Sequence, residues 1–421
     1  MPILRLLANY VKNYRNDKTA LYIFSIMILF WAVYEGIISY MTPIIISNNG
    51  ISESMMGIII GTSSIAGALF DFIACQIFKN TYYKRIFLIM FAICLIYPLI
   101  LSQANSFIIY LLAMATWGVY FDLKNIGNFD FVGRHTSKSE HVSSFGIIQI
   151  FQSIGFLLAP ILAGLLIADG FNYQPLVMAW VFLIISIIFF IILYHLKDKN
   201  SPIPELETKY HQRKKTWKGL LLNWEDIGKI LFPVLILTMT LNFIDAFFWT
   251  IGPIFAESLT QLKEFSGFFM TAYSLPSLLV GWIIGSLARK YGKKKTAFVS
   301  LFIGAAFLSL TYFINNGVLL ILNIFVASIF ISMSWPSISG AYADYISETP
   351  HYEKEIVGLQ DFFTNLGYVL GPISAGFIAD YIGNHGAFSF LGVIGIIIAI
   401  ILMFITPKKI NVNKSLEKVR S

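Results

Sequence analysis

The sequence predicts an all-α membrane protein with twelve transmembrane helices, arranged as two parallel repeats of six. Three observations support this fold class. The 421 residues are 57% hydrophobic and only 13% charged, with a mean hydropathy of +0.72. A soluble chain of this length carries far more charge on its surface. Apolar runs of about 20 residues, long enough to cross roughly 30 Å of hydrocarbon, recur along the whole chain, and the second half repeats features of the first.

The apolar runs delimit the individual spans. We predict twelve helices, at approximately residues 20–46, 55–78, 86–103, 107–131, 142–168, 174–195, 230–256, 265–288, 296–314, 318–341, 356–380 and 386–406. These boundaries divide the chain into an N-terminal six-helix bundle (1–196), a linker rich in charge and proline (197–229), and a C-terminal six-helix bundle with a tail (230–421).

The net charge of +7 follows the predicted topology. Of the 30 Lys and Arg residues, 28 fall in the termini and in loops on one side of the spans. Lys263 alone lies on the other side, and Lys124 lies within a span. Cytoplasmic loops carry such an excess of basic residues, so we expect both termini and the linker in the cytoplasm. This distribution argues against nucleic acid as a partner, and the compact loops favour a bacterial plasma membrane.

The internal repeat is visible residue by residue. Glu35 corresponds to Asp245 and Gly57 to Gly267, each 210 positions apart. The segment GIIQIFQSIGFLLAPILAG aligns without gaps on GLQDFFTNLGYVLGPISAG, 212 positions further on. Two halves that both start on the cytoplasmic side are parallel repeats related by an axis along the membrane normal.

Twelve spans, a basic central loop and this repeat resemble the major facilitator superfamily over essentially the whole chain. The segment GSLARKYGKKK, which contains Gly285 and Gly292, is similar to the family's signature between the eighth and ninth spans, with Arg289 where the pattern usually has Asp. The corresponding first-half segment, CQIFKNTYYKR, departs strongly from that signature.

The fifth span resembles the family's drug–proton antiporters. Their pattern G-x8-G-x3-GP-x2-GG is matched by Gly146, Gly155, Pro160 and Gly164, with alanine replacing glycine at two places. The eleventh span carries the equivalent Gly367 and Pro372. Small residues four positions apart let helices approach closely, so ordinary helix packing explains the spacing equally well. Proline inside a span bends the helix by removing a backbone hydrogen bond.

Glu35 and Asp245 are carboxylates within the first helix of each repeat, a placement that costs several kcal/mol in hydrocarbon. Both lie about 15 residues, or roughly 22 Å, from the cytoplasmic end. The family resemblance implies that these two helices line a central cavity. A carboxyl group withdrawn from water can hold a proton at neutral pH. We therefore expect both acids to carry a proton or to bind a cationic substrate, although a structural hydrogen bond is the alternative.

A second group of charges lies on the second and fourth spans and comprises Asp71, Asp122 and Lys124. Asp122 and Lys124 are two positions apart and so cannot face each other well on a helix. A buried lysine needs a partner, and Asp71 lies at the same expected depth of about 10 Å. The sequence predicts an Asp71–Lys124 pair, which would serve either as a static ion pair or as a proton-linked gate.

Further candidate residues for the cavity are aromatic or polar. Trp31, Tyr34 and Trp249 flank the two acids, and their rings would face either a ligand or the lipid and protein interior. Gln149, Gln152, Asp361 and Asn365 lie on the fifth and eleventh spans, which the resemblance places across the interface between the two halves.

These features predict a secondary active transporter rather than an enzyme, working by alternating access as a monomer among membrane lipids. We expect a small-molecule substrate and protons as partners, no cofactor and no metal; no G-x4-GK[ST] loop for nucleotide is present. Proton-coupled efflux of an apolar or cationic compound is favoured by the fifth-span pattern. The alternatives are a proton-coupled importer of a sugar, peptide or organic acid, and a receptor or scaffold with a transporter fold.

Overall fold

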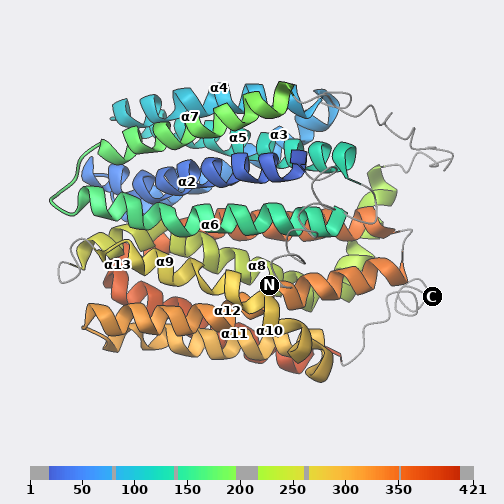
Figure 1. The fold of residues 1–421 in the computed structure, drawn as a ribbon. Helices are drawn as coiled ribbons and strands as arrows, with labels where there is room; N and C mark the ends of the chain where they lie inside the picture. The colour runs from blue at the N-terminus through green and yellow to red at the C-terminus, as the bar shows by residue number, and fades with distance from the viewer. Residues whose placement is uncertain are drawn as a thin grey trace, which may run out of the picture.

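The computed structural model describes residues 19–77, 82–136, 141–195, 217–259, 265–349 and 352–407. Long helices run side by side across the molecule (Figure 1). Those from the first half of the chain group in the upper part of that view, and those from the second half group in the lower part. Within the described ranges the secondary structure is helical, without strands.

The first half of the chain forms six long helices. They are α2 (Thr19–Asn48), α3 (Glu53–Ile77), α4 (Tyr83–Gln103), α5 (Phe107–His135), α6 (His141–Ile167) and α7 (Gln174–His195). Each is long enough and apolar enough to cross a membrane.

The second half begins with α8, which runs from Trp217 to Ser258 and so makes part of the predicted linker helical. It continues with α9 (Phe268–Ser274), α10 (Pro276–Tyr291), α11 (Lys293–Ser309), the short 3₁₀ helix η3 (Leu310–Phe313), α12 (Gly317–Glu348) and α13 (Glu353–Ile405).

Two irregularities explain how this half accommodates six spans. Helices α9 and α10 are together long enough and apolar enough for one span, with a bend of 66° between Val280 and Ile284. Helix α13 has 53 residues, about 80 Å of helix and far more than one membrane crossing. It is interrupted at Gly383, whose φ of 70° breaks the helical backbone. Counting α13 as two spans and the bent pair as one gives the twelve predicted spans.

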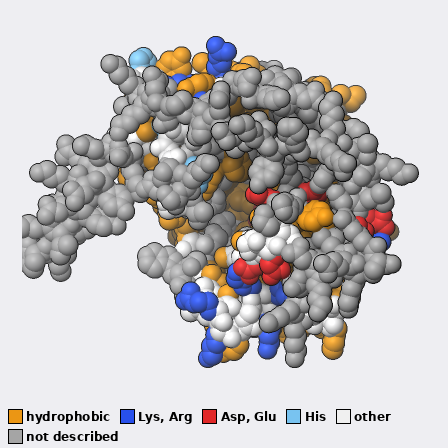
Figure 2. Space-filling model, turned by 90° about the vertical axis from the view of Figure 1, so that its right-hand side faces the viewer, with side chains coloured by type: hydrophobic (Ala, Val, Ile, Leu, Met, Phe, Trp, Pro, Cys, Tyr) orange, Lys and Arg blue, Asp and Glu red, His pale blue; other side chains and the backbone are white. Residues whose placement is uncertain are grey.

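The two ends of the molecule are named here by the chain segments that they carry. The terminal face carries Thr19 and Pro407, and the opposite face carries the short connections 49–52, 104–106, 168–173 and 314–316, together with Gly383. Figure 2 views the terminal face and shows a hollow near its middle with hydrophobic side chains inside it.

The outer surface of the helices is strongly apolar, as a membrane protein requires. Leu69, Ile108 and Phe404 expose 64%, 68% and 86% of their surface. The interior is packed with aromatic rings: Phe24 stacks on Phe131 with their centroids 3.8 Å apart, and Phe255 stacks on Phe388 at 5.4 Å. Large apolar side chains therefore face both the protein core and the surroundings.

Two seams join the halves, and they are related by the repeat. In the first seam, α3 packs on α13 so closely that a Cβ atom at Gly57 would meet the carbonyl oxygen of Pro372. In the second, α9 packs on α6 so closely that a Cβ atom at the equivalent Gly267 would meet the carbonyl oxygen of Pro160. Glycine is required at both crossings because any side chain would push the backbones apart.

The first seam carries an additional clasp at the opposite face. The carboxylate of Asp380, on α13, accepts hydrogen bonds from the backbone N–H groups of Glu53 (3.1 Å) and Ser54 (2.9 Å) at the start of α3. It also accepts a bond from the Ser54 hydroxyl. A carboxylate is well suited to the unsatisfied N–H groups and positive dipole of a helix N-terminus. In the second seam, the hydroxyl of Thr271 donates to the carbonyl of Leu157 at 3.2 Å.

Candidate functional site

Glu35 lies inside the N-terminal helices and is 1% exposed. Its carboxylate accepts a hydrogen bond from the indole Nε1 of Trp117 and another, 2.7 Å long, from the phenol of Tyr120. Both donors come from α5, and Tyr120 in turn packs edge-on against Tyr97 of α4, with ring centroids 5.6 Å apart. The carboxylate is thus fixed between α2 and α5, with side-chain donors for both of its oxygens.

Lys124, also on α5, is the positive charge beside this carboxylate. It is 3% exposed and interacts electrostatically with Glu35. Its ammonium group donates to Oδ1 of Asn125 at 3.1 Å and lies 5.0 Å from the ring centroids of both Trp31 and Phe121. Aromatic faces stabilise a desolvated cation. The acid and the base of this group are therefore buried in the same half of the molecule.

Trp31 and Tyr34 lie in the interior of the first half, and a cavity role for them stays a prediction. Both side chains are fully buried, so neither lines an open cavity in this structure. Trp31 packs on the chain's own cation, Lys124, and the Tyr34 hydroxyl donates to the backbone carbonyl of Cys94 at 2.8 Å. These contacts turn the two rings into the protein interior.

Asp245 occupies the corresponding place in the second half, and it too accepts two hydrogen bonds. The phenol of Tyr273, from α9, donates to one carboxylate oxygen at 2.8 Å, and the phenol of Tyr368, from α13, donates to the other at 2.7 Å. The Tyr273 ring stacks on Phe248 with a centroid distance of 3.9 Å. Asp245 is partly exposed, unlike Glu35. The repeat therefore conserves a doubly hydrogen-bonded acid but changes its partners and its access to solvent.

The remaining predicted charges are placed as follows. The side chain of Asp71 lies outside the described residues, so the Asp71–Lys124 pair stays a prediction. Asp122 contributes electrostatically to the surroundings of Lys124, and its carboxylate lies against the backbone at Gly67 of α3.

The polar and aromatic cavity candidates differ in exposure. Gln149 and Asp361 are exposed, whereas Gln152, Trp249 and Asn365 are half-buried. Trp249 makes an edge contact with Phe156 of α6, with their centroids 6.1 Å apart, so this pair bridges the two halves. The cavity role of these residues stays a prediction.

The glycine and proline motifs differ in what they do. Gly155 packs against α2 near Ala32, Gly164 packs against Gly267, and Gly367 packs against Met239 and Asn242 of α8. Gly292 has φ = 89° between α10 and α11, a conformation suited to glycine.

Two of the motif glycines are not in close contact with another helix. Nothing lies within 4 Å of a Cβ atom built at Gly146, and only the flexible end of Arg289 lies near Gly285. The helix-packing role thus applies to part of the motif.

Sequence reasoning missed the donors to the two acids. The missed donors Trp117 and Tyr120 lie three positions apart, and the predicted Lys124 lies four positions beyond Tyr120. The three therefore share one face of the fourth span, a signal present in the sequence. Tyr273 and Tyr368 come from helices far apart in the chain, and only the fold brings them to Asp245. Among the described residues no three or more His, Cys, Asp or Glu side chains gather in an arrangement that would hold a metal ion.

Comparison with known proteins identifies relatives of this chain. The family model of the Major Facilitator Superfamily matches residues 22–257 and 231–421. The chain is 26% identical over 261 residues to the uncharacterized MFS-type transporter YuxJ of Bacillus subtilis, a match covering 59% of this chain and 62% of that protein. It is 28% identical over 163 residues to the quinolone resistance protein NorA of Staphylococcus aureus, covering 37% of this chain and 40% of that protein.

Solved structures share the fold at lower sequence identity. The nucleoside transporter NupG superposes with a TM-score of 0.71 at 15% identity, over 92% of this chain and all of that one. A bacterial homolog of the human lysosomal transporter Spinster superposes with a TM-score of 0.70 at 13% identity, over 96% and 98% of the two chains. With the family model matched across almost all of its length and this fold in common, the chain belongs to the Major Facilitator Superfamily of membrane transporters.

Proposed function

We propose that the protein is a proton-coupled antiporter that exports a small apolar or cationic organic compound, with Glu35 as the principal proton carrier. The observation that carries this proposal is the arrangement of Glu35, Trp117, Tyr120 and Lys124. A carboxylate in hydrocarbon is costly, yet here its two oxygens have side-chain donors and Lys124 interacts with it electrostatically. Such a group exists in both a charged and a protonated form at moderate cost.

The burial of Glu35 supports a role in coupling. A carrier must keep its proton, or its negative charge, while the two halves move; otherwise protons leak without transport. With 1% of its surface exposed, Glu35 exchanges protons only in a conformation that admits water to α2 and α5. Lys124 would stabilise the carboxylate when the proton leaves, because opposite charges favour each other's charged form.

The substrate class is supported by two observations. The hollow on the terminal face contains hydrophobic side chains (Figure 2), and a compound with apolar surface gains free energy by entering such a site. NorA is named for quinolone resistance, which makes quinolones a suitable probe. The two acids add a preference for positive charge.

The proposal extends to orientation and assembly. The terminal face carries the exposed cations Lys229, Arg289, Lys290 and Lys295, and we place this face in the cytoplasm of a bacterial plasma membrane by the positive-inside rule. One chain supplies both acids and both seams, so a monomer is the proposed transport unit.

Transport into inverted membrane vesicles tests the function. With the vesicle interior made acidic, the parent is expected to accumulate a quinolone or a lipophilic cation and to release protons in exchange. Glu35→Gln keeps an oxygen acceptor but cannot lose a proton, so it is expected to equilibrate substrate without accumulating it. The matched control is Glu225→Gln, which removes an exposed acid paired with Lys229 at 2.7 Å.

The results separate the alternatives. Uphill transport by Glu35→Gln at the parent's level contradicts its role as the carrier. Accumulation of sugars, peptides or organic acids by right-side-out vesicles, driven by inward protons, would favour an importer. A folded protein that moves no solute from the panel in either direction would favour a receptor or scaffold.

A further inference from the structure

A cleft on the outside of the second half combines an apolar lining with unneutralised positive charge. It has a volume of about 380 Å³ and is formed where α10, α11 and α12 meet. This volume is within the range of small-ligand sites in proteins. Its apolar lining consists of Leu287, Tyr291, Val299, Ile303, Phe330 and Met333.

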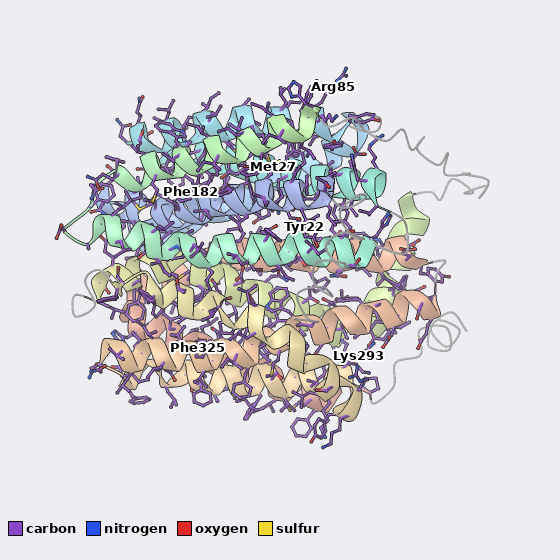
Figure 3. The ribbon with its side chains drawn as sticks, viewed as in Figure 1. Tyr22, Met27, Arg85, Phe182, Lys293 and Phe325 are labelled. Atoms are coloured by element: carbon purple, nitrogen blue, oxygen red, sulfur yellow. The ribbon has the colours of Figure 1, made fainter. Side chains whose placement is uncertain are left out.

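The cleft starts at the terminal face and extends into the membrane-spanning part of the bundle. Lys293, labelled in Figure 3, lies at the start of α11, where α10 ends. From Lys295 to Ile303, the first and last lining residues on α11, the helix rises about 12 Å. That is less than half the thickness of the hydrocarbon core, which is about 30 Å, so the cleft lies within one leaflet.

The cations at the mouth differ in how they are engaged. Lys293 donates to both carboxylate oxygens of Asp344, at 2.7 and 2.8 Å, and Lys294 donates to the carbonyl of Pro407 at 2.7 Å. Lys295 lines the cleft and is exposed, and the described part of the chain gives its ammonium group no hydrogen-bond or ion-pair partner. The ammonium group of Lys290 lies 5.1 Å from the ring of Tyr291, another lining residue. Asp344 is already engaged by Lys293, which leaves Lys290 and Lys295 to attract an anion.

A polar group further inside the cleft points to the same kind of ligand. Ser300 lines the cleft and is 6% exposed, and its hydroxyl has no hydrogen-bond partner among the described residues. A hydroxyl that lines a mostly apolar cleft is available to donate a hydrogen bond to a ligand there. Its position five residues beyond Lys295 puts it about 7 Å deeper along α11. An acceptor lying below an anionic head would satisfy it.

We propose that this cleft is a binding site for one anionic phospholipid of the adjacent leaflet. Lys290 and Lys295 bind the phosphate, Ser300 donates to an ester carbonyl of the glycerol backbone, and one acyl chain fills the apolar cleft. Basic pockets between transmembrane helices bind anionic head groups in this way. This site is separate from Glu35 and Asp245, so the proposal does not depend on the direction or coupling of transport.

Native mass spectrometry of the detergent-solubilised full chain, titrated with phosphatidylglycerol or phosphatidylcholine, tests the site. The parent is expected to retain one phosphatidylglycerol molecule in preference to phosphatidylcholine. Each lysine near the surface contributes about fivefold in affinity for an anionic lipid, so Lys290→Gln with Lys295→Gln should weaken retention roughly thirtyfold. Lys229→Gln, an exposed lysine of the same face outside the cleft, should leave retention unchanged.

A second variant separates the acyl chain from the charge. Val299→Phe fills the cleft without changing its charge and should also weaken retention of phosphatidylglycerol. Equal retention of the two lipids by the parent, or an equal loss in Lys229→Gln, would overturn the proposal. So would thermal stabilisation of the parent by inorganic phosphate to the same extent as by phosphatidylglycerol, because the site would then take a free anion and not a lipid.

Discussion

Replacing Asp380 with alanine is expected to weaken the closed seam between the two halves at the opposite face. The Asp380 carboxylate receives three hydrogen bonds from the first residues of α3, and it belongs to the other half of the molecule. When the seam opens, those N–H groups turn to water. The substitution therefore affects the closed arrangement and leaves the open one nearly unchanged.

The magnitude follows from the chemistry of a helix cap. Removing a capping side chain costs about 0.5–2 kcal/mol, typically about 1. Because the cap joins the two halves, this cost shifts the equilibrium between the closed and open arrangements by about fivefold, within a range of roughly two- to thirtyfold.

Pulsed electron–electron double resonance, which measures distances between two spin labels, reports this shift. Asn105 and Asn315 are exposed in connections of the opposite face, one in each half, and can carry the labels after both native cysteines are replaced by alanine. The long-distance population should rise about fivefold relative to the short-distance population in Asp380→Ala. The control is Asp169→Ala, an exposed acid just beyond the end of α6 on the same face. Distance distributions that stay unchanged in Asp380→Ala, or change equally in the control, would refute the reasoning.

Three further predictions concern the second acid, the seam and the topology. Asp245→Asn keeps an oxygen acceptor for one of the two tyrosine hydroxyls and cannot lose a proton. The number of protons exchanged per substrate, read from the reversal pH gradient, should therefore fall; an unchanged ratio would exclude Asp245 as a proton site. Gly57→Ala should open the seam in the same resonance measurement because its Cβ would meet the Pro372 carbonyl, whereas Gly146→Ala, in open space, should have no effect. An impermeant maleimide added to intact cells should label Asn105→Cys but not Glu225→Cys, and the reverse pattern would invert the proposed orientation.

The fold was predictable because each membrane span can be recognised from the hydropathy of its own stretch of sequence. Apolar runs define spans wherever water is absent, since every backbone polar group there must be bonded within its own helix. Helix α13 contains both the eleventh and the twelfth predicted spans. The sequence separates them because the break at Gly383 lies between two apolar runs. The bend in the eighth span lies within one apolar run, and hydropathy cannot show a bend.

The site was only half predictable. The two acids stand out because each interrupts an apolar run, and intramembrane charge is rare. The direction in which a side chain points depends on helix rotation, which composition does not determine. For Trp31 and Tyr34 the sequence left a ligand-facing and an interior position open, and the structure buries them against Lys124 and Cys94. Tyr368 reaches Asp245 from 123 residues away, a contact that depends on the packing of α13 on α8.

The two glycine–proline crossings also determine how the two halves can move relative to each other. At Gly57 and Gly267 the backbones of opposing halves are in direct contact, so the halves can approach no further at these points but can rotate about them. A line through these two contacts is the expected axis of rotation, and most of each half lies between this axis and the terminal face. A small rotation about this axis produces a large displacement of the helix ends around the mouth of the hollow. The sequence repeat supplies both contacts from one pattern. A larger side chain at either glycine would therefore displace one end of the rotation axis and change the rotation of the two halves.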